Sequence, residues 1–448
     1  MTLPRPARLR SLPLFAIPLE DLACAALFAF FAMQGSIPGI APSSALEITG
    51  SAPTGFTTMG GIATQAVANG LIVLLILRRP RLVLRGITLV PWAALLAGLA
   101  MASALWSLDP ALTIRRAFPF ALAGAFGLWF SLRFPAPRQR AILRLTMTAL
   151  AAATIAVVVC APAIGLDHTP GHGADWQGVF TQKNACGRMM VLATAVILWE
   201  ARLTRARFAS LLLFLFVLLM SGSRGAWLIE AAVIALWLAR LGAPRMGARL
   251  RLVAAVAAPA GALTAAVLMS LPPPGILSLL GRDATLSGRT EIWAQVWHFI
   301  RLHPVFGYGY DAFWRGMKGP SLEIDAAVHF VVEHAHNGFL EIGLELGLAG
   351  LALFAFSWLA AAWKLLPFWL SGEMAPITFP LAVLALVALY DFDENTLLIY
   401  NGLFWPLYVA ALVTIECAAR DRRHEQERRR RDILSATPKE DAALLEVS

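Results

Sequence analysis

Long apolar runs separated by short polar segments dominate this chain. A helix needs about 20 mostly apolar residues to cross the hydrocarbon core of a bilayer. The pattern predicts about twelve such helices, at roughly residues 14–34, 60–77, 86–105, 117–132, 141–162, 185–201, 207–221, 225–241, 250–271, 338–363, 375–391 and 398–418. The polar residues 221–225, between the seventh and eighth runs, predict a tight hairpin.

The composition supports the same class of protein. Of 448 residues, 58% are apolar and only 15% are charged, and the mean hydropathy is +0.67. Soluble domains carry roughly 25% charged residues, so this chain could not cover a water-facing surface of its size. The sequence therefore predicts an all-α integral membrane protein.

The basic residues predict the orientation of the helices. With a cytoplasmic N-terminus, 27 of the 37 Lys and Arg residues fall on the cytoplasmic side, as the positive-inside rule expects. The net charge of +9 then reflects topology and anionic lipid headgroups, and it requires no nucleic-acid partner. Each remaining basic residue could be an ordinary exposed charge, but together they are candidates for binding an anion. They are Arg115, Arg116, Lys183, Arg188, Arg224, Arg282, Arg289, Arg301, Arg315 and Lys318.

These patterns divide the chain into five parts. They are a cytoplasmic N-terminal tail (1–13), transmembrane helices (14–271), a large periplasmic loop (272–337), further transmembrane helices (338–418) and a cytoplasmic basic tail (419–448). The first apolar run lacks a small-residue cleavage site, so we interpret it as an uncleaved first helix. We expect the charged residues 428–431 and those that follow to be disordered and solvated.

The His-Ala-His-Asn run at residues 334–337 ends the long polar loop and lies directly before an apolar helix. Ionisable groups at the edge of a membrane helix usually serve a pathway or a reaction. Glu333, Glu341 and Glu345 add carboxylates to the same short piece of chain. This junction is therefore the predicted reaction centre of a membrane-embedded transferase.

An ordered set of short motifs supports that interpretation. They are Gly-Val-Phe-Thr-Gln-Lys-Asn (178–184), Ser-Gly-Ser-Arg-Gly (221–225), Gly-Arg-Thr-Glu-Ile-Trp (288–293), His-Pro-Val-Phe-Gly-Tyr-Gly-Tyr (303–310) and His-Ala-His-Asn-Gly-Phe-Leu-Glu (334–341), followed by Gly-Leu-Ala-Gly (347–350). At these residues the chain resembles the O-antigen ligase and O-antigen or exopolysaccharide polymerase family. The Lys183-Asn184 pair and the Gly-Tyr-Gly-Tyr run are most similar to the exopolysaccharide polymerase branch.

The resemblance implies a GT-C-like, metal-independent, inverting glycosyltransferase without a cofactor. It would lie in the bacterial inner membrane with its active site facing the periplasm. The donor would be a glycan on undecaprenyl pyrophosphate and the acceptor another sugar chain, with a flippase and a chain-length regulator as candidate partners. We favour the interpretation that the protein is a polymerase, which joins repeat units into a longer glycan. An O-antigen ligase, which uses a lipid A–core acceptor, and a polyisoprenoid-glycan transporter are the alternatives.

That reaction assigns roles to the candidate residues. A pyrophosphate leaving group needs fixed positive charge beside its phosphates, and arginine supplies planar, permanently charged donors. Arg224 and Arg289 are the first choices because Gly and small hydroxyl residues flank them, followed by Lys183 and Arg188. Asn184, Asn337 and Glu291 are supporting candidates.

The acceptor hydroxyl must lose a proton, and an imidazole with a pKa near neutrality suits this base role. His336 is the first candidate, and His334 could orient a sugar or take its place. Either Glu333 or Glu341 could hold the imidazole, with Glu341 counted among the catalytic candidates.

Plainer explanations compete with each assignment. The two histidines could bind zinc with His329 or His303, or simply lie at the interface. Glu341 and Glu345 share one helical face and could pair with an outer arginine. An aromatic belt explains the outer aromatics more readily than sugar stacking does; they are Trp293, Trp297, Trp314, Tyr308 and Tyr310. The polar residues 391–395 could bind sugar, but we favour a solvated turn.

Overall fold

The computed structural model describes residues 18–436, apart from 38–58, 169–173, 201–202, 243–244, 248, 252, 254–288, 317 and 374–375. The described part is helical, with one isolated backbone bridge between Leu166 and Trp176. Its helices are α1 (Leu19–Ala32), α3 (Met59–Arg78), α4 (Pro80–Leu89), α5 (Pro91–Ala102), η1 (Ser103–Leu105), α6 (Pro110–Arg133), α7 (Ala136–Cys160), α8 (Pro162–Gly165), α9 (Lys183–Leu198), α10 (Arg205–Met220), α11 (Arg224–Gly242), α14 (Arg289–Leu302), α15 (Ser321–Val328), α16 (Gly338–Ser371), α17 (Thr378–Asp393) and α18 (Phe404–Ala436).

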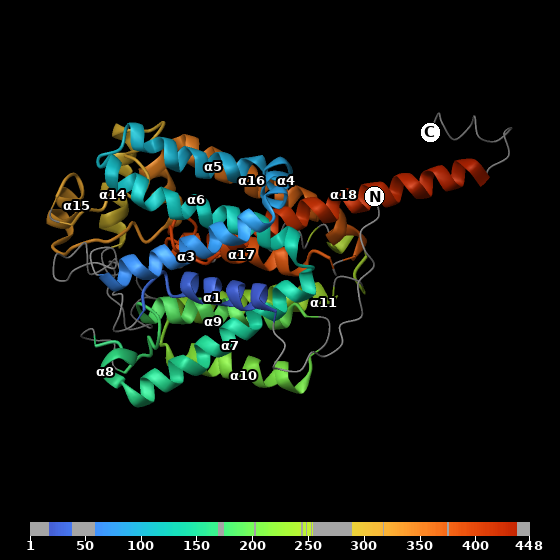
Figure 1. Cartoon of the computed structure of the whole chain (residues 1–448), viewed down its shortest axis with the longest axis horizontal. Coiled ribbons are helices and arrows are strands. Elements are labelled where there is room, and N and C mark those ends of the chain that lie inside the picture. The colour runs from blue at the N-terminus through green and yellow to red at the C-terminus, as the bar shows by residue number, and fades with distance from the viewer. Residues whose placement is uncertain are drawn as a thin grey trace.

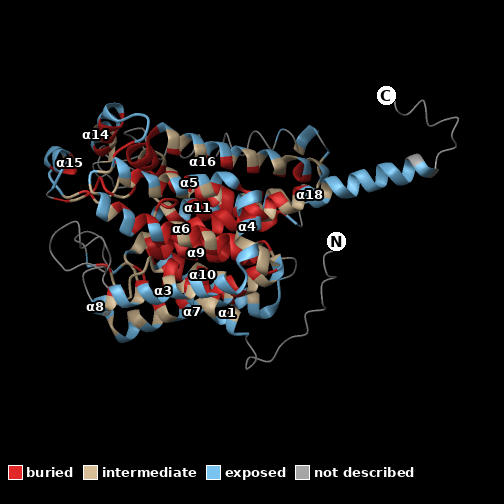
Figure 2. Cartoon of the chain, turned by 45° about the horizontal axis from the view of Figure 1, so that its top comes forward, coloured by how far each residue is buried: buried red, intermediate tan, exposed pale blue. Residues whose placement is uncertain are grey.

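The long helices run side by side, with α14 and α15 at one end of the bundle (Figure 1). The C-terminal part of α18 projects from the opposite end. Buried residues concentrate in the middle of the bundle (Figure 2), where α6 packs against α18 and α9 packs against α7 and α10. At the α6–α18 contact a Cβ on Gly127 would lie 2.4 Å from the backbone oxygen of Pro406. Only glycine allows the two backbones to approach so closely.

Four described helices are long and apolar enough to cross a membrane, by length and composition: α3, α7, α11 and α16. A fifth span results if the bent pair of α4 and the helices that follow it, through Leu105, is counted as one. Helix α3 coincides with the predicted run 60–77, and the predicted hairpin at 221–225 joins α10 to α11. The described helices therefore agree with an all-α membrane protein, while the count of twelve spans stays a prediction.

Two predicted helices have different bounds in the structure. The predicted span 86–105 is not one helix, because α4 and α5 meet at a bend of 102°. Pro91 is the cause: it lacks a backbone N–H, and it disfavours helical geometry at Val90, whose φ is −133°. The predicted span 398–418 begins too early, since α18 starts at Phe404.

The prediction of disorder at residues 428–431 was wrong, because α18 continues as a helix to Ala436. Acidic and basic side chains four residues apart stabilise its exposed part. Arg420 Nε lies 2.7 Å from Glu416 Oε1, and Arg429 Nη2 lies 2.6 Å from Glu425 Oε1. The predicted span 250–271 and the loop up to residue 288 lie almost entirely outside the described residues.

Helix α16 is broken at Gly347, which has φ 64° and ψ −161°. Residues 304–309 fit into the break and pair with the helix groups that it releases. Tyr308 N donates to Leu344 O (3.0 Å) and Gly309 N to Glu345 O (3.0 Å), while Leu348 N donates to Pro304 O (2.8 Å). A buried backbone group must find a partner, so this pairing explains why the Gly-Tyr-Gly-Tyr run and the Gly at 347 occur together.

The same segment ties the loop to the rest of the bundle through Tyr310, which is fully buried. Its backbone N donates to Ser103 Oγ (2.9 Å), and its backbone oxygen accepts from Thr113 Oγ1 (2.9 Å). Its hydroxyl donates to Leu398 O. The aromatic-belt prediction is therefore wrong for Tyr310, and also for Tyr308 and Trp314, which lie in a second apolar cluster with α14.

Candidate functional site

The His-Asn junction is positioned by Asn337, which caps α16. Its Oδ1 accepts from Leu340 N (3.0 Å), and its Nδ2 donates to Phe392 O at the end of α17 (3.3 Å). The next residue, Gly338, packs so closely that a Cβ there would lie 2.3 Å from Asp391 Oδ1. An asparagine supplies both a donor and an acceptor, so this side chain fixes the start of α16 against α17.

Glu394 lies at the centre of the site, directly after α17. Its side chain is 5% exposed, and its Oε2 lies 3.3 Å from His336 Nδ1 and 3.6 Å from His334 Nε2. The solvated turn that we favoured for residues 391–395 is therefore wrong for Glu394. The sequence also suggested Glu333 or Glu341 as the carboxylate that holds an imidazole, whereas Glu394 contacts both rings. No pattern in the sequence distinguishes Glu394 from its acidic neighbours.

The charges around Glu394 fix its ionisation. Burial by itself would raise the pKa of this carboxyl. The imidazole of His336 and the guanidinium of Arg289 outweigh burial and hold the pKa of Glu394 well below its usual range. Glu394 is therefore a carboxylate at neutral pH, and it only accepts hydrogen bonds.

The two histidines differ in their surroundings. His334 Nδ1 accepts from the backbone N–H of His336 at 3.1 Å, and burial lowers the pKa of His334 to about 3. His334 is thus neutral at pH 7, with its proton on Nε2 facing Glu394. His336 has a positive φ of 48°, a left-handed conformation that is uncommon for residues other than glycine. The His336 ring is placed by this backbone conformation together with its contact to Glu394 at 3.3 Å.

Arg289 joins the same cluster from the first turn of α14. Its Nη1 donates to Asp393 Oδ1 (2.9 Å) and Asp393 O (3.0 Å), and its Nη2 lies 3.4 Å from Glu394 Oε1. Burial would lower the pKa of Arg289, but the carboxylates of Glu394 and Asp393 outweigh it and raise that pKa. The structure therefore brings Arg289 and His336 together on two sides of one carboxylate.

The first turns of α9 bring further predicted residues to this cluster. Asn184 Nδ2 lies 3.4 Å from Glu394 Oε1, and its Oδ1 accepts from Ser223 Oγ (3.0 Å). Arg188 is buried, and its Nη1 donates to Asn395 O (3.3 Å). Lys183 Nζ lies 2.7 Å from Asp175 Oδ2, a carboxylate that the sequence analysis did not single out. Asn184 and Arg188 therefore contact the 391–395 segment, whereas Lys183 pairs with Asp175.

The remaining predicted residues lie at the edge of the site. Arg224 begins α11 with an exposed side chain, and a Cβ on the following Gly225 would lie 2.5 Å from Asp393 Oδ2. The start of α11 is thus packed against the carboxylate that holds Arg289. Glu291 is exposed, and its Oε2 accepts from Thr290 Oγ1 (2.9 Å). The structure therefore brings Arg224 near the cluster but leaves Glu291 at the surface.

Glu341 contacts the backbone of the histidine loop. It is 1% exposed, its Oε1 accepts from Trp314 Nε1 (2.6 Å), and its Oε2 accepts from Ala335 N (2.7 Å). Glu345, one turn further along α16, is also buried, as the shared helical face predicted. Glu341 contacts Trp314 and the loop backbone, whereas the sequence suggested a pair with an outer arginine. Glu341 is thus tied to the histidine loop by a direct hydrogen bond, and its catalytic role stays a prediction.

Among the described residues, one cluster has the geometry to hold a metal ion: His334, His336 and Glu394, whose ligand atoms lie within 4.8 Å of one another. The zinc alternative predicted His329 or His303 as the third ligand, whereas the third member here is a carboxylate. Arg289 already contacts this carboxylate, and a neighbouring guanidinium opposes the binding of a second cation. Metal independence stays a prediction.

Two comparisons with known proteins bear on this site. The family model described as O-antigen ligase matches residues 209–355, which include Arg224, Arg289 and the histidine loop. The exopolysaccharide production protein ExoQ of Rhizobium meliloti (strain 1021) is 31% identical over 255 residues. That match covers 53% of this chain and 58% of the relative, so the chain spans little more than half of that relative's length. The resemblance to the O-antigen ligase and exopolysaccharide polymerase family is confirmed.

Proposed function

We propose that this protein transfers a glycan from undecaprenyl pyrophosphate to a sugar hydroxyl, at the end of the bundle that holds the histidine cluster. One observation carries the proposal: the buried Glu394 carboxylate joins the His336 imidazole to the Arg289 guanidinium. A base for the attacking hydroxyl and a cation for the leaving phosphates therefore both contact the same carboxylate. Both groups are needed at the same anomeric carbon.

In this mechanism His336 is the general base. Because Glu394 is ionised, it accepts a hydrogen bond from Nδ1–H of His336, and this leaves the Nε2 lone pair for the acceptor hydroxyl. The hydroxyl oxygen bonds to the anomeric carbon as its proton passes to Nε2. The bond from that carbon to the phosphate oxygen breaks, undecaprenyl pyrophosphate leaves, and a single displacement inverts the anomeric configuration.

His334 is a positioning residue in the same mechanism. Its Nδ1 lone pair is occupied by the backbone N–H of His336, and its other nitrogen carries a proton toward Glu394. It therefore has no free lone pair to accept the proton of the substrate. The choice between the two histidines, which the sequence left open, falls to His336.

The leaving pyrophosphate is assigned to the cationic groups around Glu394. Arg289 pairs with Asp393 at the start of α14. Arg224 begins α11 directly before Gly225, which packs against Asp393, and Lys183 lies at the start of α9. The N-terminus of a helix adds partial positive charge to such side chains. Together these groups would stabilise the charge that develops as the glycosidic bond breaks.

We favour polymerisation of exopolysaccharide or O-antigen repeat units, because the relative is an exopolysaccharide production protein. Transfer to lipid A–core by an O-antigen ligase uses the same chemistry and is the second candidate, supported by the matching family model. In both cases the site would face the periplasm from the inner membrane, where a flippase and a chain-length regulator could supply the donor and limit the product.

The test is glycan transfer by purified protein in proteoliposomes with a lipid-linked donor. A lost general base lowers rates by about 100- to 10,000-fold, so we expect this loss for His336→Ala. We expect a smaller loss for His334→Ala, which removes only a positioning contact. Equal rates for wild-type protein and His336→Ala would refute the base assignment, provided that both variants elute as folded monodisperse protein.

A further inference from the structure

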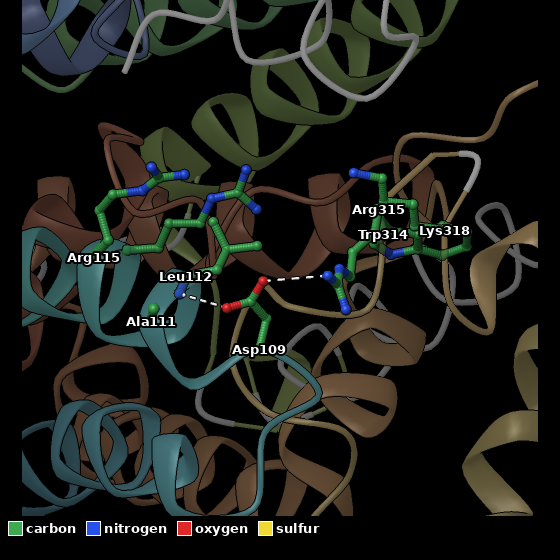
Figure 3. A pocket seen from close by; sticks show the side chains of 8 residues that line it. Asp109, Ala111, Leu112, Arg115, Trp314, Arg315 and Lys318 are labelled. Carbon is green, nitrogen blue, oxygen red and sulfur yellow. Dashed lines mark hydrogen bonds and ion pairs between the residues drawn. The ribbon is translucent and has the colours of Figure 1, made fainter. Parts of the chain in front are cut away.

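A cationic pocket lies beside the first turns of α6 and shares no side chain with the histidine cluster. Its volume is about 390 Å³, within the range of small-molecule sites. The pocket is shown in Figure 3. It is lined by Asp109, Ala111, Leu112, Arg115, Arg116, Trp314, Arg315 and Lys318. We call it the α6 pocket.

Two segments far apart in the sequence form its walls. Arg115 comes from α6, whereas Arg315 and Lys318 face it from the loop before α15 (Figure 3). Asp109 caps α6 by accepting from Leu112 N (3.1 Å), and its Oδ2 lies 3.3 Å from Arg315 Nη2. This ion pair joins the two walls of the pocket.

The base of the pocket is also ordered. Arg116 is 4% exposed, and its Nη1 donates to Asp311 O (2.8 Å) and Asp311 Oδ1 (3.0 Å). The lining thus carries four cationic groups and one carboxylate, that of Asp109. A second carboxylate, that of Asp311, pairs with Arg116 but does not line the pocket. The N-terminus of α6 adds further positive potential. Such a cavity favours an anionic ligand.

The pyrophosphate of the donor does not account for this pocket, because the proposed function assigns it to Arg289, Arg224 and Lys183. The pocket is nevertheless connected to the reaction centre. Trp314, which lines it, donates from Nε1 to Glu341 Oε1 (2.6 Å), and Glu341 Oε2 accepts from Ala335 N between the two histidines (2.7 Å). Two hydrogen bonds therefore link a wall of the pocket to the backbone that carries the base.

We propose that the α6 pocket binds an anionic sugar residue of the acceptor glycan, through its carboxylate or phosphate. That the sugar belongs to the acceptor rests on the proposed function. That the ligand is an anionic sugar rests on the pocket alone. A cavity of this volume holds a sugar ring with its charged substituent. The hydrogen bonds through Trp314 and Glu341 connect the pocket to the histidine loop. A pocket connected to the reaction centre suits an acceptor sugar better than a phospholipid headgroup.

Direct binding tests the proposal without any transfer reaction. Wild-type protein in nanodiscs of phosphatidylcholine is titrated with an oligogalacturonate and with the same oligosaccharide after chemical reduction of its carboxyls. The test variant is Arg115→Ala combined with Lys318→Ala, because both side chains are exposed and their loss should leave the fold intact. The matched control is Arg301→Ala, which removes an exposed arginine from the end of α14.

We expect the wild type and Arg301→Ala to bind the acidic oligosaccharide equally, and the double variant to bind it at least about tenfold more weakly, since each lost contact is charge-assisted. The reduced oligosaccharide should bind weakly to all three. Equal affinity of the double variant and the wild type, or binding that survives carboxyl reduction, would overturn the proposal. Absence of glycan transfer alongside selective acidic binding would refute the proposed function instead.

A further titration separates an acidic sugar from a lipid headgroup. Phosphatidylglycerol added to the nanodiscs should lower the affinity of every variant for the oligosaccharide by the same factor, through general repulsion. If it lowers the wild-type affinity to that of the double variant, the headgroup occupies the pocket and the proposal fails.

Discussion

Replacing Glu394 by Gln removes one negative charge from the centre of the site while preserving side-chain length. His336 Nδ1 loses its anionic acceptor at 3.3 Å, and Arg289 loses one of its two carboxylate partners. A hydrogen bond to a charged group contributes about 1.5–3 kcal/mol, and each 1.36 kcal/mol corresponds to a factor of about ten in rate. We therefore expect kcat to fall about 10- to 150-fold.

The assay is the initial rate of glycan transfer in proteoliposomes as lipid-linked donor and acceptor are varied. The matched control is Glu323→Gln, the same chemical change at an exposed position of α15, which should keep the wild-type rate. A kcat for Glu394→Gln within twofold of wild type, in protein with an unchanged melting temperature, would refute the role of Glu394 in orienting the base.

Three further predictions concern the donor, the fold and the metal. Arg289→Ala should raise the KM for donor about tenfold or more, and Arg289→Lys should restore only part of it because an ammonium lacks the planar fork; an unchanged donor KM for Arg289→Ala would assign this arginine to the loop alone. Gly347→Ala should destabilise the protein by about 1–3 kcal/mol through backbone strain. The new Cβ would also lie 2.4 Å from Val305 backbone atoms and clash with them. Gly70→Ala, with no atom near its Cβ, should not lower the melting temperature, and equal melting temperatures for both would contradict this account. Transfer should persist in excess chelator, without stoichiometric zinc in the purified protein; activity restored only by a divalent ion would make the histidine cluster a metal site.

The elements that the sequence predicted well are those in which hydrophobic length decides the structure. Helix α3 is an example, because a run of 20 mostly apolar residues has few alternatives to a membrane helix. The bend at Pro91 was missed because the predicted span 86–105 is mostly apolar on both sides of this proline. Hydropathy does not distinguish a bent pair from one straight helix, although the proline itself was a usable signal.

The site was predicted in part for a related reason. His336, Asn337 and Arg289 stand out because polar groups interrupt apolar chain. Glu394 did not stand out, since it lies within a short acidic segment whose sequence suits a solvated turn. Its burial depends on α9, α14 and the histidine loop packing around it, and these contacts join residues more than 50 positions apart. Local sequence carries little information about such contacts.

Glu341 illustrates how packing adds contacts that a motif does not reveal. Its place in the motif next to the histidines suggested catalysis. In the structure its two oxygens accept from Trp314 and from the loop backbone. These two hydrogen bonds join Glu341 to Trp314 and to the backbone between the two histidines.

The central claim is that the protein breaks a sugar–pyrophosphate bond as it forms a glycosidic bond. The most direct measurement counts both products in one proteoliposome reaction: undecaprenyl pyrophosphate released, and glycosidic bonds formed on the acceptor. We expect one released lipid for each new bond with wild-type protein, and neither product above background with His336→Ala. Movement of intact lipid-linked glycan across the bilayer without release of undecaprenyl pyrophosphate would contradict the account and indicate a transporter.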